Sequence, residues 1–137
     1  MGDATAGSSE ELSLLLYVQK MAARREYLAK PVPVSVVNGR RFTLVQFFQP
    51  EELWSSVSGE IVLARAESVH ALLGLENAEM FLEHAGEIGT GWQGFCPVFP
   101  GTLIWYLIWR GRSAGWRIGT YEPHALLEQH FRLVVEV

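Results

Sequence analysis

The amino-terminal part of the chain carries hydrophobic residues at helical spacing. Ser8 and Glu11 match a capping box ahead of a run of leucines, and this pattern predicts a helix from about Glu10 to Ala29. Pro31 ends it, because the residue before a proline is displaced from the helical region. The apolar stripe of this helix comprises Leu12, Leu15, Leu16, Ala23 and Tyr27. The charged residues expected to face water are Lys20, Arg24 and Arg25.

A first β-hairpin is predicted directly after this helix. The dipeptide Asn38-Gly39 separates two runs rich in β-forming residues, 32–37 and 40–48. Asn-Gly between such runs is a strong hairpin signal, because a type I′ turn needs positive φ at both central positions. Pro33 places the first strand at a sheet edge, since proline cannot donate a hydrogen bond to a neighbouring strand.

A second hairpin is predicted nearer the carboxyl terminus. Its strands, 103–110 and 116–121, flank the turn sequence Arg112-Ser113-Ala114-Gly115. Within 103–109 the odd-numbered and the even-numbered residues are all apolar. Successive side chains of a strand point to opposite faces of the sheet, so this strand is predicted to be covered on both sides and therefore central.

Shorter elements complete the pattern. Further strands are predicted over 59–66 and 131–137, and short helices over 50–54, 69–75, 78–85 and 122–129. The segment 86–101, with five glycines and two prolines, is predicted to be a loop.

This order of elements predicts an α+β (mixed α/β) fold. We expect a single compact domain with a mixed, mostly antiparallel sheet of five or six strands and helices packed against it. A chain of 137 residues, 49% hydrophobic and 19% charged, has room for one domain with its own core. Residues 1–9 are small and polar and are expected to form a disordered tail ahead of the domain at 10–137.

Charge and cysteine content bear on partners and compartment. A net charge of −4 argues against bulk attraction to nucleic acid or to an anionic membrane. The longest apolar run, 103–109, has the length of a strand and not of a membrane span. The single cysteine, Cys96, suits a reducing compartment, and the amino terminus lacks the regions of a secretory signal. A soluble, cytoplasmic protein is expected.

Catalytic chemistry is not favoured by the residues available. The only aspartate is Asp3, in the expected tail, so schemes that need a buried aspartate lack their acid. The histidines show no metal-ligand spacing; they are His70, His84, His124 and His130. No cofactor or metal is predicted, and we expect a non-enzymatic protein. A site assembled from scattered Glu, His and Tyr residues stays open at this level.

The second hairpin is the predicted contact surface. Its tip combines tryptophan and arginine, the residue types that dominate interface hot spots: Trp109, Arg110, Arg112, Trp116 and Arg117. The sequence therefore favours a non-catalytic intracellular binding module that meets a protein partner or forms a homo-oligomer. Nucleic acid is disfavoured by the acidic composition, and the arginines could instead stack on the tryptophans of the hairpin itself.

The alternative hypothesis is a small enzyme or small-molecule binder. Its pocket would lie under the loop 86–101 and be lined by Trp92, Phe95, Cys96 and Phe99, with a His or Glu as base. The same loop contains Gly89-Thr90-Gly91-Trp92-Gln93-Gly94, which matches G-x-G-x-x-G. That motif binds dinucleotides only between a strand and a helix, and this context is not predicted here.

Overall fold

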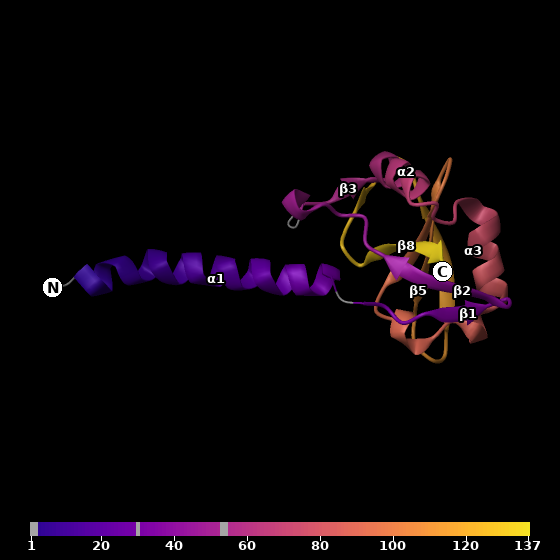
Figure 1. Ribbon diagram of the computed structural model, residues 1–137, viewed down its shortest axis with the longest axis horizontal. Coiled ribbons are helices and arrows are strands. Elements are labelled where there is room, and N and C mark those ends of the chain that lie inside the picture. Colours follow the sequence, from indigo (N-terminus) through magenta and orange to yellow (C-terminus); the bar gives the residue numbers. More distant parts are fainter. Residues whose placement is uncertain (1–2, 30, 53–54) are drawn as a thin grey trace.

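Six strands form one sheet in the order β1-β2-β8-β4-β5-β6, and two short strands, β3 and β7, form a second sheet (Figure 1). The computed structural model describes residues 3–29, 31–52 and 55–137. The strands are β1 Ser35–Val37, β2 Arg40–Val45, β3 Val57–Ser58, β4 Cys96–Pro100, β5 Ile104–Trp109, β6 Trp116–Tyr121, β7 Leu126–Leu127 and β8 Phe131–Glu136. Of the described strand pairs, β4 with β8 is parallel and the others are antiparallel. The predicted α+β class with a mostly antiparallel sheet is confirmed.

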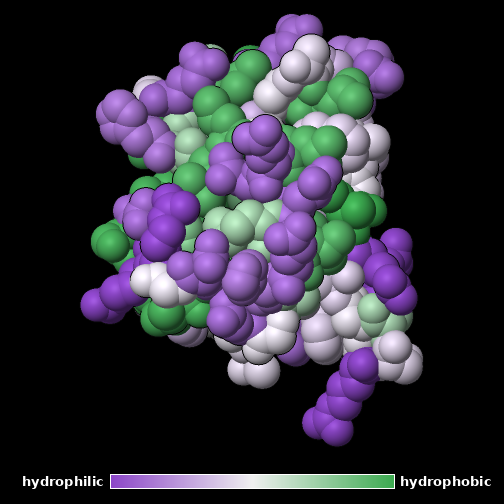
Figure 2. Space-filling model, turned by 90° about the vertical axis from the view of Figure 1, so that its right-hand side faces the viewer, coloured by the Kyte–Doolittle hydropathy of each residue, from purple (hydrophilic) through white to green (hydrophobic). Residues whose placement is uncertain are grey.

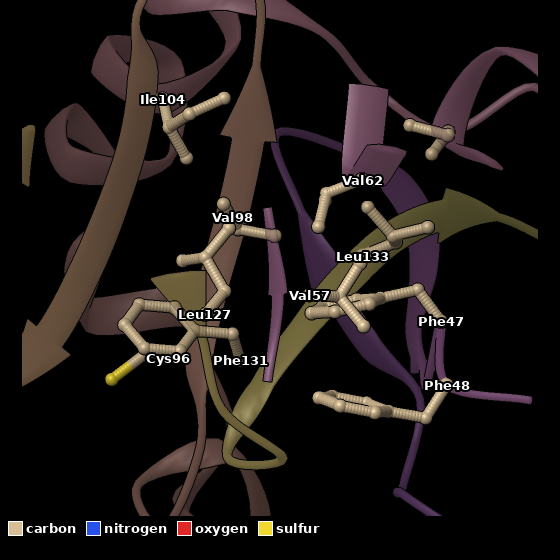
Figure 3. Close-up of a cluster of buried hydrophobic side chains, with 12 residues drawn as sticks. Phe47, Phe48, Val57, Val62, Cys96, Val98, Ile104, Leu127, Phe131 and Leu133 are labelled. Carbon is tan, nitrogen blue, oxygen red and sulfur yellow. The ribbon is translucent and has the colours of Figure 1, made fainter. Parts of the chain in front are cut away.

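Helices cover both faces of the six-stranded sheet. The α-helices are α1 Asp3–Ala29, α2 Gly59–Ser68 and α3 Gly74–Glu83, and the 3₁₀ turns are Pro50–Glu52, Ala85–Glu87 and Thr90–Trp92. One buried cluster joins Val62 of α2 to Val98 and Leu133 of the sheet, whose side chains point toward one another (Figure 3). A second cluster joins Phe81 of α3 to the next residues along the same strands, Phe99 and Val134. This alternation puts α2 and α3 on opposite faces.

The first hairpin confirms its prediction. Asn38 and Gly39 have φ values of 52° and 75°, as a type I′ turn requires, and Val37 pairs with Arg40 across the turn. Strand β1 lies at the edge of the sheet, as Pro33 indicated.

The strand predicted over 59–66 is wrong, because these residues form α2. Ser58 caps the helix, its hydroxyl accepting a hydrogen bond from the Ile61 amide at 3.5 Å. Val62 and Ala66, one turn apart, are fully buried. A short apolar run such as 61–63 cannot be assigned to strand or helix by periodicity alone, so burial against the sheet decides it.

The other differences lie in connecting segments. The helices predicted over 69–75 and 78–85 are replaced by one helix, α3, because Gly74 (φ 80°) begins it and does not interrupt it. The helix predicted over 122–129 is wrong, since 126–127 pair with β3. The loop predicted over 86–101 contains strand β4, every residue of which is buried. The helix predicted over 50–54 is a 3₁₀ turn at 50–52; Leu53 and Trp54 lie outside the described residues.

Helix α1 begins earlier than predicted and projects away from the sheet (Figure 1). It starts at Asp3 and not at Glu10, so 3–9 are its first turns where a disordered tail was expected; Met1 and Gly2 lie outside the described residues. Its large apolar side chains at Leu12 and at 14–18 are 51–64% exposed. No helix in the described part of the chain is long and apolar enough to cross a membrane.

Candidate functional site: the tip of the second hairpin

The second hairpin has the predicted strands and a firm base. Strand β5 lies between β4 and β6, and Trp109 and Trp116 form the last pair before the turn. The turn closes on itself, since the Arg110 amide donates to the Gly115 carbonyl at 3.0 Å and the Gly115 amide donates to the Gly111 carbonyl at 2.7 Å. The tip is thus held by backbone hydrogen bonds at the end of an interior strand.

The sheet separates the predicted tryptophans from the arginines. Trp109 and Trp116 meet edge to face, with ring centroids 5.7 Å apart, and both belong to the cluster on the α3 side. Arg117 pairs with Ile108, which packs on the α2 side, so strand alternation sends the arginine to that face. The charge of Arg110 acts on the thiol of Cys96, which also lies on the α2 side. The five residues therefore do not form one mixed patch.

The arginines of the hairpin tip lie at the surface of the protein. Arg110, Arg112 and Arg117 are all exposed, and none of them makes an ion pair with a described residue. Among the described residues none of the three arginines stacks on a tryptophan. The cation–π contacts found among those residues involve Arg40 and Arg132. Arg40 of the first hairpin, by contrast, is paired with Glu136 at 2.7 Å.

An open hollow of about 460 Å³ lies beside the tip. One wall is formed by Leu82 and Ala85, at and just beyond the end of α3, and the other by Ala114–Ile118 of the hairpin. Trp116, only 5% exposed, is one of the lining residues. The hollow is large enough to take one or two apolar side chains of a ligand.

Surfaces of opposite charge flank this hollow. The outer face of α3 exposes Glu76, Glu79 and Glu83, which lie three and four residues apart on one side of the helix. Viewed from the α3 side of the molecule, hydrophilic side chains form a central band with hydrophobic patches on both sides (Figure 2). Of the three tip arginines only Arg117 is among the lining residues of the hollow, and Arg110 lies toward the α2 side of the sheet. The hollow thus has acidic side chains of α3 near one wall and Arg117 in the other.

The four residues of the alternative pocket do not line a common space. Trp92 and Phe99 are fully buried on the α3 side, each packed against Phe81, and Phe95 is partly buried against the same cluster. Cys96 lies on the other side of the sheet, beside Phe131 (Figure 3). These side chains belong to the core, and because Cys96 is on the opposite side of the sheet from the other three, the four do not converge on one pocket.

The glycine-rich motif at 89–94 holds the edge of the sheet. The Gly89 amide donates to the Ser35 hydroxyl at 2.9 Å, and the Trp92 indole donates to the Pro33 carbonyl at 2.7 Å. The motif forms a 3₁₀ turn followed by strand β4, so its amides do not open a helix toward a phosphate group. Its role is to fix the chain just before β1.

Three titratable groups near the α2 side have pKa values shifted toward their uncharged forms: Cys96, Tyr106 and His130. Burial raises the pKa of the Cys96 thiol to about 11, and the nearby charge of Arg110 only partly opposes this. Burial and a hydrogen bond with Tyr121 raise the pKa of Tyr106, and burial lowers the pKa of His130. A protonated thiol is a poor nucleophile, so this group lacks the activation that covalent catalysis needs. The described residues also contain no cluster of His, Cys, Asp or Glu that could hold a metal ion.

One feature of this face could have been found from the hairpin register. Gly119 lies directly opposite Tyr106, and a β-carbon at position 119 would clash with the Tyr106 ring. The tyrosine thus lies flat over the glycine, a known way of covering a glycine in a strand. Its ring also stacks on Tyr121 at 4.9 Å between centroids. The pair lies toward the end of the hairpin away from the tip, since Tyr121 pairs with Ile104.

Comparison with known proteins adds no relative: no family model, curated protein or solved structure matches this chain significantly.

Proposed function

We propose that this protein is a non-catalytic binding module that holds an acidic protein segment at the tip of the second hairpin. The observation that carries the proposal is the group of three exposed arginines, Arg110, Arg112 and Arg117, without ion-pair partners among the described residues. The net charge of the chain is −4, so a group of three arginines makes this part of the surface positive within an acidic protein. It draws acidic ligands and repels basic ones.

The hollow beside the tip supports an apolar anchor in the same ligand. Its lining includes the apolar residues Leu82, Trp116 and Ile118. A leucine or phenylalanine flanked by glutamates would place its side chain there and a carboxylate toward Arg117, which borders the same hollow. Arginine binds carboxylates with two parallel hydrogen bonds, which adds geometric selectivity to the charge attraction.

The alternative, an enzyme with a nucleophilic Cys96, has weaker support. The thiol pKa of about 11 keeps the sulfur protonated near neutral pH. The amide of Cys96 donates to the His130 carbonyl at 2.8 Å, whereas the His130 ring packs on Phe131. The backbone contact thus positions the strand and does not activate the thiol.

A peptide titration tests the proposal. The probe is a panel of fluorescent peptides in which two glutamates flank one leucine or phenylalanine, beside the same peptides with lysine in place of glutamate. We expect binding of the acidic set alone. Arg112→Ala should weaken it by about 1–2 kcal/mol, the usual range for an interface arginine near a hot spot, and leave folding nearly unchanged.

The matched control is Arg41→Ala, which removes an exposed arginine from the first hairpin. Its peptide affinity should equal that of the unmodified protein. If the double variant Arg112→Ala, Arg117→Ala binds the acidic peptides with unchanged affinity, the hairpin is not the contact surface.

A further inference from the structure

The two edge strands of the six-stranded sheet, β1 and β6, differ in what contacts them from outside. Segment 85–92 contacts β1, where the Gly89 amide donates to the Ser35 hydroxyl at 2.9 Å. Beside this contact, the Trp92 indole donates to the Pro33 carbonyl at 2.7 Å. Strand β6 pairs with β5 on one side, and no strand of the described chain lies on its other side. An uncovered edge offers its N–H and C=O groups to a strand of another molecule.

Half of the backbone groups of β6 point toward this open edge. In an antiparallel pair, the residues that exchange hydrogen bonds alternate along each strand. The Arg110 amide donates to the Gly115 carbonyl, so every second residue of β6 after Gly115 is bonded to β5. The backbone groups that point away from β5 are therefore those of Trp116, Ile118 and Thr120. Within the described ranges, none of these three makes a backbone hydrogen bond to a loop or turn.

The side chains of β6 suit an added strand on both faces of the sheet. Trp116 and Ile118 line the hollow on the α3 side, whereas Arg117 alternates with them and points to the α2 side. A residue added opposite Ile118 would point to the same side as Ile118, where the hollow lies. Its two neighbours in the added strand would point to the α2 side, and one of them would lie opposite Arg117, within reach of the guanidinium group.

The charges on the two faces determine which residues fit at these positions. The α3 wall of the hollow is the carboxyl end of a helix with Glu83 as its last residue, so it disfavours a carboxylate and suits an apolar side chain. On the α2 side Arg117 is exposed, and Arg110 lies toward the same side. An extended Glu-Leu-Glu segment puts its leucine on the α3 side and both glutamates on the α2 side.

A second copy of β6 fits this edge less well than an acidic segment. In a two-fold antiparallel pair centred on Ile118, each Arg117 lies opposite Gly119 of the other copy. The two Arg117 side chains are then diagonal neighbours on one face, with a spacing of about 7–8 Å. Like charges at this spacing repel each other, whereas a glutamate opposite Arg117 attracts it.

We propose that the acidic segment binds as an extended strand antiparallel to β6, with its apolar residue opposite Ile118 and a glutamate opposite Arg117. This inference rests on the proposed function and specifies the conformation and register of the same ligand. Antiparallel pairing is the more stable arrangement per residue. Hydrogen bonds to the backbone of β6 supply affinity, and the hollow and Arg117 supply selectivity.

A backbone-methylation scan of the ligand tests this geometry on the unmodified protein. The probe is a fluorescent Glu-Leu-Glu peptide, compared with versions that carry one N-methyl group at the leucine or at either glutamate. The residue opposite Ile118 exchanges both hydrogen bonds with it, so N-methylation of the leucine should weaken binding by about tenfold or more. The matched control is N-methylation of a glutamate, whose amide points to solvent, and it should change the affinity by less than about twofold.

The scan separates failure of this inference from failure of the proposed function. Equal effects at the three positions, in peptides that still bind, would overturn the added strand and leave the proposed function intact. Losses at the glutamates alone would indicate a parallel strand and overturn the antiparallel one. If no acidic peptide binds, both the proposed function and the added strand are wrong.

Amide hydrogen exchange measures the same geometry on the protein. In the free protein the amides of Trp116, Ile118 and Thr120 should exchange faster than those of Arg117 and Gly119, which are bonded to β5. Saturation with the peptide should slow exchange at Ile118 by about tenfold or more, because its amide becomes hydrogen-bonded. Unchanged exchange at Ile118 in the complex would contradict the added strand. Slow exchange there in a free protein that is dimeric would show that a second copy covers this edge, which would also overturn it.

Discussion

The two β-hairpins of this protein differ in how their turns contact the rest of the fold. The first is tied down at its turn, where the Asn38 amide donates to the Glu87 carboxylate at 2.8 Å, and at its strand, where Arg40 pairs with Glu136. The second has its tryptophans in the core and its tip arginines free of ion pairs among the residues described. Arg41 of the first hairpin is also exposed and without an ion pair in the described part of the chain, so the two hairpins differ in their tips: the first turn is bonded to Glu87, and the second presents three unpaired arginines.

The difference also shows why residue types alone do not locate a binding surface. Tryptophan and arginine at a hairpin tip are typical of hot spots, yet Trp116 is 5% exposed and serves the core. What remains for a partner is the guanidinium groups and the apolar hollow beside them. Each hairpin can be perturbed separately, which makes the comparison testable.

The largest effect is expected from Trp92→Ala, which removes the anchor of the first hairpin. Trp92 is fully buried, and its indole donates to Pro33 at 2.7 Å. Loss of a buried tryptophan costs about 3–5 kcal/mol of unfolding free energy. In the second hairpin, Trp109→Ala should cost about 1–2 kcal/mol, because that side chain is only partly buried. Urea unfolding measures both, and equal losses would contradict the proposed difference.

A smaller loss of unfolding free energy is expected from Gly39→Val in the first turn. Its φ of 75° is strongly disfavoured for a β-branched residue, although space around the glycine is open. The strain should cost about 1–3 kcal/mol of unfolding free energy. Chemical denaturation checks this, and a neutral result would mean that the turn relaxes to another type.

The smallest effect is expected at Cys96, where the second hairpin meets the α2 side of the sheet. Its thiol pKa of about 11 predicts slow alkylation by iodoacetamide at pH 8. Because this pKa lies above the ordinary value of 9.0, the stability that the thiol contributes is present below pH 9 and is lost as the pH rises toward 11. Arg110→Ala should raise the pKa slightly further. An alkylation midpoint at or below pH 8 would revive the enzyme hypothesis.

Local signals account for the parts of the fold that the sequence predicted. The Asn38-Gly39 turn and the apolar run 103–109 each predict a hairpin, because the two strands of a hairpin are only a few residues apart in the sequence. Strand β4 was missed because its pairing with β8 is distant in sequence and its prolines are untypical of an interior strand. Helix α2 was missed because its assignment depends on burial against that same strand.

The candidate site was predictable in part. The arginines at the tip were identified from residue type, and strand alternation already placed Trp109 with Trp105 and Leu107 on one face. The hollow depends on how the end of α3 approaches β6, which no local pattern contains. The exposure of the apolar side chains of α1 could not be predicted either, because the sequence pattern of an apolar helix face does not show whether the rest of the chain packs against it.

Chemical-shift mapping with an acidic peptide tests the central claim most directly. The ¹⁵N-labelled full chain is titrated with the tightest peptide of two glutamates around one apolar residue, and the backbone amides that move are assigned. Shifts at 110–118 and at 82–85, with the first hairpin at 35–45 unmoved, are the result predicted here. Shifts confined to the first hairpin or to 86–95, with 110–118 unchanged, would contradict the claim that the second hairpin is the contact surface.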